Sequence, residues 1–75
     1  MNFLLRDLKQ SGIMRHDCLA FNERHLIDHM LKAAPGRAIM HMGDKVRPGP
    51  YWAVHADDVP ALMAAGYRVE REASA

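Results

Sequence analysis

The pattern of apolar and polar positions first predicts a short amphipathic helix near the start of the chain, from Asn2 to Gln10. Leu4, Leu5 and Leu8 fall on one side of this segment, and charged or amide side chains occupy the remaining positions. Gly12 follows closely, and glycine is common just beyond a helix C-terminus. We therefore expect the first helix to end there.

The best-marked helix is predicted from residue 22 to residue 34. Asn22 is expected to cap it by accepting a bond from a free amide of the first turn, and Pro35-Gly36 to end it. The preceding residues, 13 to 20, have no clear period and are expected to form a connector whose apolar members cover the core. The apolar side chains of the helix form one stripe at helical spacing: Leu26, Ile27, Met30, Leu31 and Ala34.

Two short runs in the second half of the chain are predicted to pair as a β-hairpin. Residues 38–42 (AIMHM) and 51–56 (YWAVHA) contain the β-branched and aromatic side chains that strands favour. The loop between them, GDKVRPGP, is rich in turn residues. Its charged members Lys45 and Arg47 would lie near the tip of the hairpin.

A third helix and a final strand complete the chain. Asp57 is expected to cap the helix, Pro60 is tolerated because the first turn needs no amide donor there, and Gly66 would end it. The last run, YRVERE at residues 67–72, alternates between apolar and polar side chains. This period of two is typical of an amphipathic strand.

These elements predict one small α+β domain spanning residues 1–75, with the order ααββαβ and a three-stranded sheet. The compact crossover through the third helix would place the last strand parallel to residues 51–56, in a mixed sheet. The helices would pack on one face of the sheet, with the polar side chains of residues 67–72 marking an open face: Arg68, Glu70 and Glu72. Residues 72–75 are expected to fray.

Composition agrees with a small soluble domain, because 49% of the 75 residues are hydrophobic and 25% are charged. Ten basic and nine acidic residues leave a formal net charge of +1, with the two signs interspersed, so no broad field exists to attract nucleic acid or an anionic membrane. The single cysteine, Cys18, favours a reducing compartment. With no signal-peptide core and no membrane span, we expect a cytoplasmic monomer.

His25 and His29 are separated by one helical turn, a spacing at which both imidazoles can reach one metal ion. A zinc site needs further ligands, and no CxxC motif or histidine cluster supplies them in the sequence. Other candidate ligands are scattered along the chain: His16, Cys18, His41 and His55. We therefore expect neither a metal nor a cofactor, and a solvated polar face for the histidine pair.

Catalysis is not indicated either. His16, Asp17 and Cys18 contain a base, a carboxylate and a nucleophile, but catalytic groups usually meet in space from different elements. Cys18 is better explained as a small apolar residue of the core. Asp57 and Asp58 are explained by helix capping and by the helix dipole. We therefore expect a protein that acts by binding, not an enzyme.

The segments RHLIDHMLKAAPGRAIMH (residues 24–41) and YWAVHADDVPALMAAGYRVE (residues 51–70) span most of the chain. In these segments and in its size the chain resembles small phage-encoded transcription regulators. The resemblance implies binding to host RNA polymerase in the host cytoplasm, inhibition of transcription initiation and an antitermination role. No residue role is carried over from that group, because none of its contact positions matches a motif of this chain.

The residues expected to contact the partner are charged side chains that the predicted fold leaves exposed. Arginine is favoured among them because its planar guanidinium makes several hydrogen bonds at once. They are Arg6, Asp7, Arg15, His16, Lys45, Arg47, Arg68 and Arg71.

A metal-dependent protein that relies on His25 is one rival class, and two further alternatives remain open. Lys45 and Arg47, followed by the aromatic pair Tyr51-Trp52, can contact nucleic acid in the manner of a wing, although two charges give only weak and strongly salt-dependent binding. The other alternative is an inhibitor of a different host protein, such as a defence nuclease. Such an inhibitor would also act by binding a host protein, without catalysis.

Overall fold

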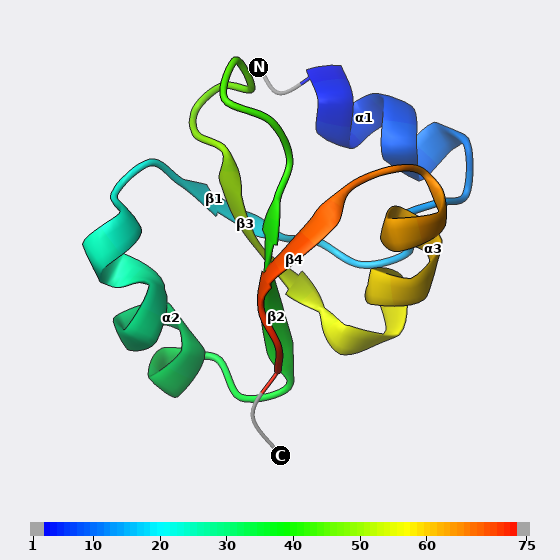
Figure 1. Ribbon diagram of the computed structural model, residues 1–75. Coiled ribbons are helices and arrows are strands. Elements are labelled where there is room, and N and C mark those ends of the chain that lie inside the picture. The colour runs from blue at the N-terminus through cyan, green and yellow to red at the C-terminus, as the bar shows by residue number, and fades with distance from the viewer. Residues whose placement is uncertain (1–2, 74–75) are drawn as a thin grey trace.

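The computed structural model describes residues 3–73, which form a four-stranded antiparallel sheet with helices on both faces (Figure 1). The domain is therefore α+β, as predicted. Along the chain the elements are α1 (Phe3–Gln10), β1 (Leu19–Phe21), the 3₁₀ turn η1 (Arg24–Leu26), α2 (Ile27–Ala33), β2 (Arg37–His41), β3 (Tyr51–His55), the 3₁₀ turn η2 (Ala56–Asp58), α3 (Val59–Ala64) and β4 (Arg68–Arg71).

The sheet has the order β1-β3-β2-β4 within residues 3–73, so the prediction of three strands was wrong. The additional strand is β1, which lies in the segment that we expected to be a connector and pairs antiparallel with β3. A strand of three residues is too short to show an alternating pattern in the sequence. With β1 included, the predicted element order was also wrong.

The final strand pairs with β2 instead of β3. β4 runs in the same direction as β3, as predicted, but β2 lies between them and is antiparallel to both. The reason is that β3 already has both edges occupied, by β1 on one side and by its hairpin partner β2 on the other. The outer edge of β2 is the position left for β4, so the sheet is antiparallel and not mixed.

Both faces of the sheet are covered, so the prediction of helices on one face was also wrong (Figure 1). Successive side chains of β3 alternate between two clusters: Tyr51 and Ala53 pack with α2, whereas Trp52 and Val54 pack with α1 and α3. β2 divides in the same way, because Ile39 belongs to the α2 cluster and its neighbour Met40 to the other. A strand that is apolar at consecutive positions must be covered on both sides.

The polar side chains of β4 do not mark an open face. The register between β2 and β4 shifts at Ile39/Met40, and Glu70 lies on the side of β4 that faces η1. Glu70 is only 17% exposed and accepts a hydrogen bond from Arg24 at 3.3 Å. The neighbouring Arg71 donates to Asp28 of α2 at 2.7 Å. Side chains expected to face solvent therefore tie the edge strand to the α2 layer.

Three members of the predicted apolar stripe pack as expected for the second helix, but its predicted start was wrong. Ile27 is buried, and Met30 and Leu31 pack against the same cluster. Asn22 does not cap the helix, because β1 extends through Phe21 and the helical turn begins only with η1. Pairing with β3 keeps the backbone extended where the local sequence favours a cap.

Candidate functional site

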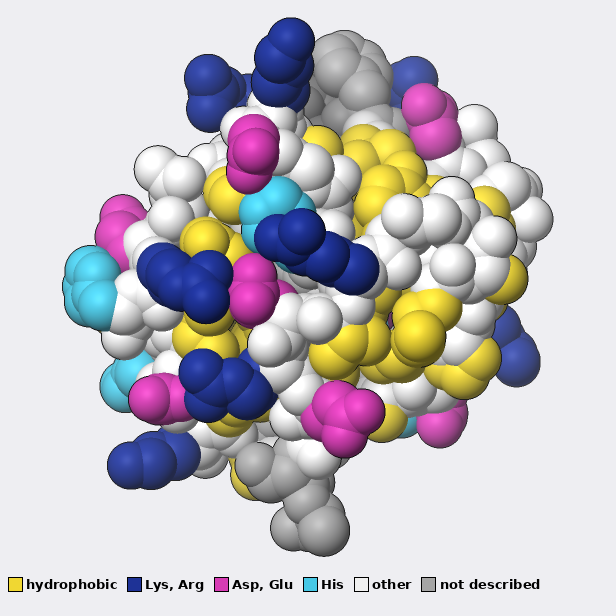
Figure 2. All heavy atoms as spheres, viewed as in Figure 1, with side chains coloured by type: hydrophobic (Ala, Val, Ile, Leu, Met, Phe, Trp, Pro, Cys, Tyr) yellow, Lys and Arg dark blue, Asp and Glu magenta, His cyan; other side chains and the backbone are white. Residues whose placement is uncertain are grey.

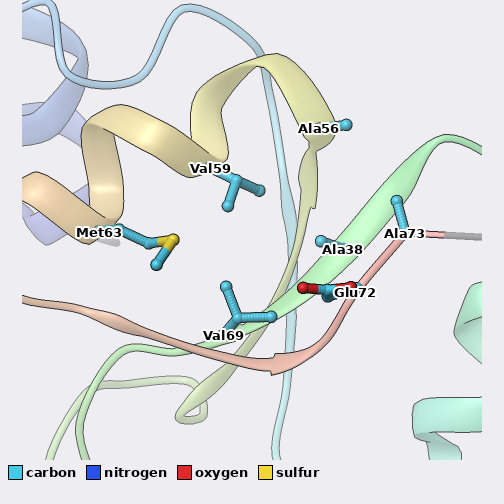
Figure 3. Close-up of a pocket in the computed structure, with 7 residues that line it drawn as sticks. All are labelled: Ala38, Ala56, Val59, Met63, Val69, Glu72 and Ala73. Carbon is cyan, nitrogen blue, oxygen red and sulfur yellow. The ribbon is translucent and has the colours of Figure 1, made fainter.

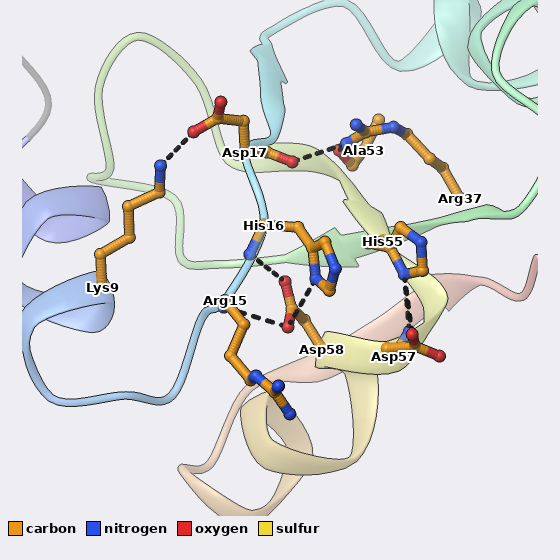
Figure 4. A network of polar contacts seen from close by, with 9 residues as sticks. All are labelled: Lys9, Arg15, His16, Asp17, Arg37, Ala53, His55, Asp57 and Asp58. Carbon is orange, nitrogen blue, oxygen red and sulfur yellow. Dashed lines mark hydrogen bonds and ion pairs between the residues drawn. The ribbon is translucent and has the colours of Figure 1, made fainter.

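Asp58, at the end of η2, is a buried carboxylate that binds a distant segment of the chain (Figure 4). Its side chain is 1% exposed and accepts two backbone hydrogen bonds, from the N–H of Arg15 and from the N–H of His16, each at 3.1 Å. The connector between α1 and β1 is thereby held against the start of α3. The predicted explanation of Asp58 by helix capping was wrong, since no side-chain capping bond forms at this position.

The same carboxylate lies beside a pair of stacked imidazoles. The Nδ1 atom of His16 is 3.4 Å from Oδ1 of Asp58. The ring of His16 stacks on the ring of His55, with centroids 4.1 Å apart and planes inclined by 14°. Both histidine side chains are 40% exposed, so the pair sits at the surface with the buried carboxylate behind it.

His55 also takes the capping role that was predicted for Asp57. The Nδ1 atom of His55 accepts a hydrogen bond from the backbone N–H of Asp57 at 3.1 Å, at the entry to η2. The carboxylate of Asp57 is exposed and lies 3.6 Å from the same nitrogen. Of the residues that the structure describes, one group of three could hold a metal ion by its donor types and spacing, with the ligand atoms within 4.8 Å of one another: His16, His55 and Asp57.

The sequence did not reveal this group, because its members are brought together by pairing across the sheet and by the bonds to Asp58. His16 precedes β1 while His55 ends β3, and no fixed sequence spacing links them. The pair that the spacing did indicate, His25 and His29, is exposed and divided between η1 and α2. Within residues 3–73 that pair has no third ligand close enough to complete a group.

Asp17 and Cys18, which follow His16 in the chain, lie in different surroundings from that histidine and from each other. Asp17 is exposed and forms an ion pair with Lys9, whose hydrogen bond and positive charge hold the pKa of the carboxyl below its usual value. Cys18 packs against the core, as predicted, and burial raises the pKa of its thiol to about 11. Arg37 ties the same segment to the sheet by donating to the carbonyl oxygens of Asp17 at 2.7 Å and Ala53 at 3.0 Å (Figure 4).

The residues predicted to contact a partner lie on four segments. Arg6 and Asp7 contact each other on α1, at 3.8 Å between Nε and Oδ1. Arg15 and His16 lie in the connector, and Lys45 and Arg47 in the exposed part of the β2–β3 loop. Arg68 and Arg71 share the edge strand β4.

An apolar groove lies beside that edge strand, between α3 and β4 (Figure 3). It has a volume of about 270 Å³ and receives side chains from η2, α3, β2, β4 and the residues after β4. Met63 on its wall is 55% exposed. The lining residues are Ala38, Ala56, Val59, Met63, Val69, Glu72 and Ala73.

Two of these residues, Glu72 and Ala73, belong to the segment that was expected to fray, whereas residues 74–75 lie outside the described part of the chain. Within that part, no strand pairs with the outer edge of β4, which lies next to the groove. Figure 2 shows the same side of the molecule, with hydrophobic side chains open to solvent among charged ones.

Comparisons with protein-family models, with curated proteins and with solved structures give no match for this chain. Over residues 3–73, no helix has the length and apolar character needed to cross a membrane.

Proposed function

We propose that this protein is a non-enzymatic regulator that binds a partner protein at the outer edge of β4. The observation that carries the proposal is the coincidence of an unpaired strand edge, within the described residues, with an apolar groove of about 270 Å³. An exposed edge presents free N–H and C=O groups to an extended peptide, and adjacent pockets select its side chains. The two features together suit β-strand addition.

In this arrangement an extended segment of the partner pairs with β4 and places an apolar side chain in the groove against Met63 and Val69. Arg68 is well placed to add a polar contact, because its side chain is 70% exposed and its nearest acidic group, Glu70, is 3.8 Å away. Arg71 already donates to Asp28, so breaking that bond for a partner would cost more.

The partner to test first is bacterial RNA polymerase, which the resemblance to phage transcription regulators suggests. Binding at a polymerase surface used for promoter recognition would inhibit initiation without any catalytic group. A nucleic-acid role for Lys45 and Arg47 gains less support. Both residues are exposed, but the chain has a net charge of only +1, so two basic side chains would have to supply most of the attraction to phosphate.

The groove can be tested with a matched pair of substitutions. Met63 and Leu19 are similarly exposed, at 55% and 54%, but Leu19 lies on β1, at the opposite edge of the sheet. We expect Met63→Asp to weaken binding to purified RNA polymerase at least about tenfold, because it places a charge in the apolar groove, and Leu19→Asp to leave binding unchanged. Biolayer interferometry with nuclease-treated polymerase measures the affinity.

Promoter-dependent transcription in vitro provides the functional readout. Inhibition by the wild-type chain and by Leu19→Asp, together with its loss in Met63→Asp, is the expected result. Equal binding by both variants would place the interface elsewhere on the domain. Failure of the wild-type chain to bind polymerase would remove that partner, and binding that disappears with nuclease treatment would point to nucleic acid.

A further inference from the structure

We propose that His16, His55 and Asp57 form a binding site for one divalent transition-metal ion of the zinc class. The site lies where the connector meets the β3–η2 junction, whereas the proposed partner pairs with the outer edge of β4 and fills the adjoining groove, which Ala56 of η2 also lines. Two imidazole nitrogens and one carboxylate oxygen are a donor set that zinc favours, with water in the fourth position. This inference is independent of the partner-binding proposal.

The three side chains are close enough to converge on one ion with small rotations. Their donor atoms lie within 4.8 Å of one another, whereas donors around a tetrahedral zinc ion are separated by about 3.3 Å. Because the lone pair of an imidazole nitrogen lies in the plane of its ring, the stacked rings do not yet point at a common centre. One ring must turn, and His55, at 40% exposed, can turn without disturbing the core. In turning, its Nδ1 atom gives up the capping bond from the N–H of Asp57.

Asp58 has the position of a carboxylate that orients a metal-binding histidine. The backbone N–H groups of Arg15 and His16 fix its oxygens, and Oδ1 lies 3.4 Å from Nδ1 of His16. A proton held on Nδ1 by this carboxylate leaves Nε2 as the ligating nitrogen. Carboxylate–histidine–metal arrangements of this kind recur in zinc sites, where the outer carboxylate sets the tautomer and orientation of the ring.

The donor set also predicts which ions will bind. Imidazole nitrogens suit Zn²⁺, Ni²⁺ and Cu²⁺, whereas Mg²⁺ and Ca²⁺ prefer sites made of oxygen ligands. The site offers Asp57 as an exposed carboxylate, with the Asp58 oxygens already engaged by backbone donors. We therefore expect binding of Zn²⁺ and no measurable binding of Mg²⁺ at the same concentration.

Isothermal titration of the untagged, chelator-treated chain with ZnCl₂ tests the site. We expect one Zn²⁺ per chain, and at least about tenfold weaker binding in His55→Ala and in Asp57→Asn. Asp57→Asn keeps the backbone N–H that donates to His55. It therefore removes the charge of the ligand without removing the capping bond of the metal-free chain. The matched control is the double variant His25→Ala/His29→Ala, which should bind Zn²⁺ like the wild-type chain.

Thermal unfolding gives a second readout, since a ligand that binds only the folded state raises the melting temperature. Zn²⁺ should stabilise the wild-type chain and the His25→Ala/His29→Ala control, but neither site variant. Far-UV circular dichroism without metal checks that each variant is folded. The proposal is overturned if the wild-type chain binds no Zn²⁺ at about 100 µM, if the site variants bind as tightly as the wild type, or if the control loses binding.

Discussion

At the scale of single residues, Asp58 does more than its position in the sequence suggests. A carboxylate that is 1% exposed is tolerated because two backbone N–H groups and the ring of His16 surround it. Its bonds join segments about forty residues apart and hold the connector in place beneath the histidine pair. This carboxylate therefore serves both the fold and the proposed metal site.

Replacing this carboxylate should destabilise the domain strongly. We expect Asp58→Ala to lower the free energy of unfolding by about 2–4 kcal/mol, because two charge-assisted bonds are lost and two backbone donors lose their acceptor. The adjacent Asp57→Ala removes an exposed carboxylate and should cost less than about 1 kcal/mol. Urea unfolding with a chelator present measures both, and similar losses in the two variants would contradict the assigned role of Asp58.

Cys18 should react slowly while the chain is folded. Burial raises the pKa of its thiol from 9.0 to about 11, so at pH 8 the thiolate fraction is roughly 100-fold smaller than in the unfolded chain. Alkylation by iodoacetamide, followed by mass spectrometry, should be slower by about that factor in buffer than in concentrated urea. Equal rates in the two conditions would show that the thiol is not protected.

The same shift in pKa sets the direction of a pH effect on stability. The folded state retains the thiol proton to higher pH than the unfolded state, so this contribution to stability is fully present below pH 9. It is lost progressively as the pH rises toward about 11, the pKa of the folded state. Cys18→Ala should remove this component of the alkaline loss of stability.

At the scale of elements, the backbone of the β2–β3 loop passes very close to the end of β1 at Gly49. A Cβ atom at this position would lie 2.2 Å from the carbonyl oxygen of Phe21 and 2.8 Å from Cα of Asn22. Those contacts involve backbone atoms, which cannot move aside as a flexible side chain would. Glycine is therefore required where the hairpin loop passes the end of the short edge strand.

Gly49→Ala should for this reason be more damaging than an alanine at a glycine in open space. We expect a loss of about 3 kcal/mol in unfolding free energy, since β1 must shift away from the loop. Gly12→Ala is the control. The added Cβ atom would meet no atom within 4 Å, but the backbone φ at this position is +81°, so the substitution should cost about 1 kcal/mol. Denaturant unfolding distinguishes the two, and equal losses would show that the close approach at Gly49 is not limiting.

At the scale of the whole molecule, the sheet separates two apolar clusters that a single layer of helices could not cover. The larger one gathers Trp52 and Leu62 with Leu8 of α1, and the smaller one places Ile27 of α2 against Ile39. The consecutive apolar run YWAV in β3 was the signal for burial on both faces. That run also explains why the open face predicted for the sheet does not exist.

Local sequence patterns were enough to predict the α+β class, the hairpin, most of the apolar stripe of the second helix and the end of the first helix before Gly12. These features depend on the period of neighbouring residues and on local turn chemistry, which the chain carries at every position. Contacts between distant segments set the pairing of β4, the strand at residues 19–21 and the meeting of His16 and His55 beside Asp58. Those features depend on which strand edges are already occupied and on contacts between segments distant in sequence, and no local pattern encodes either.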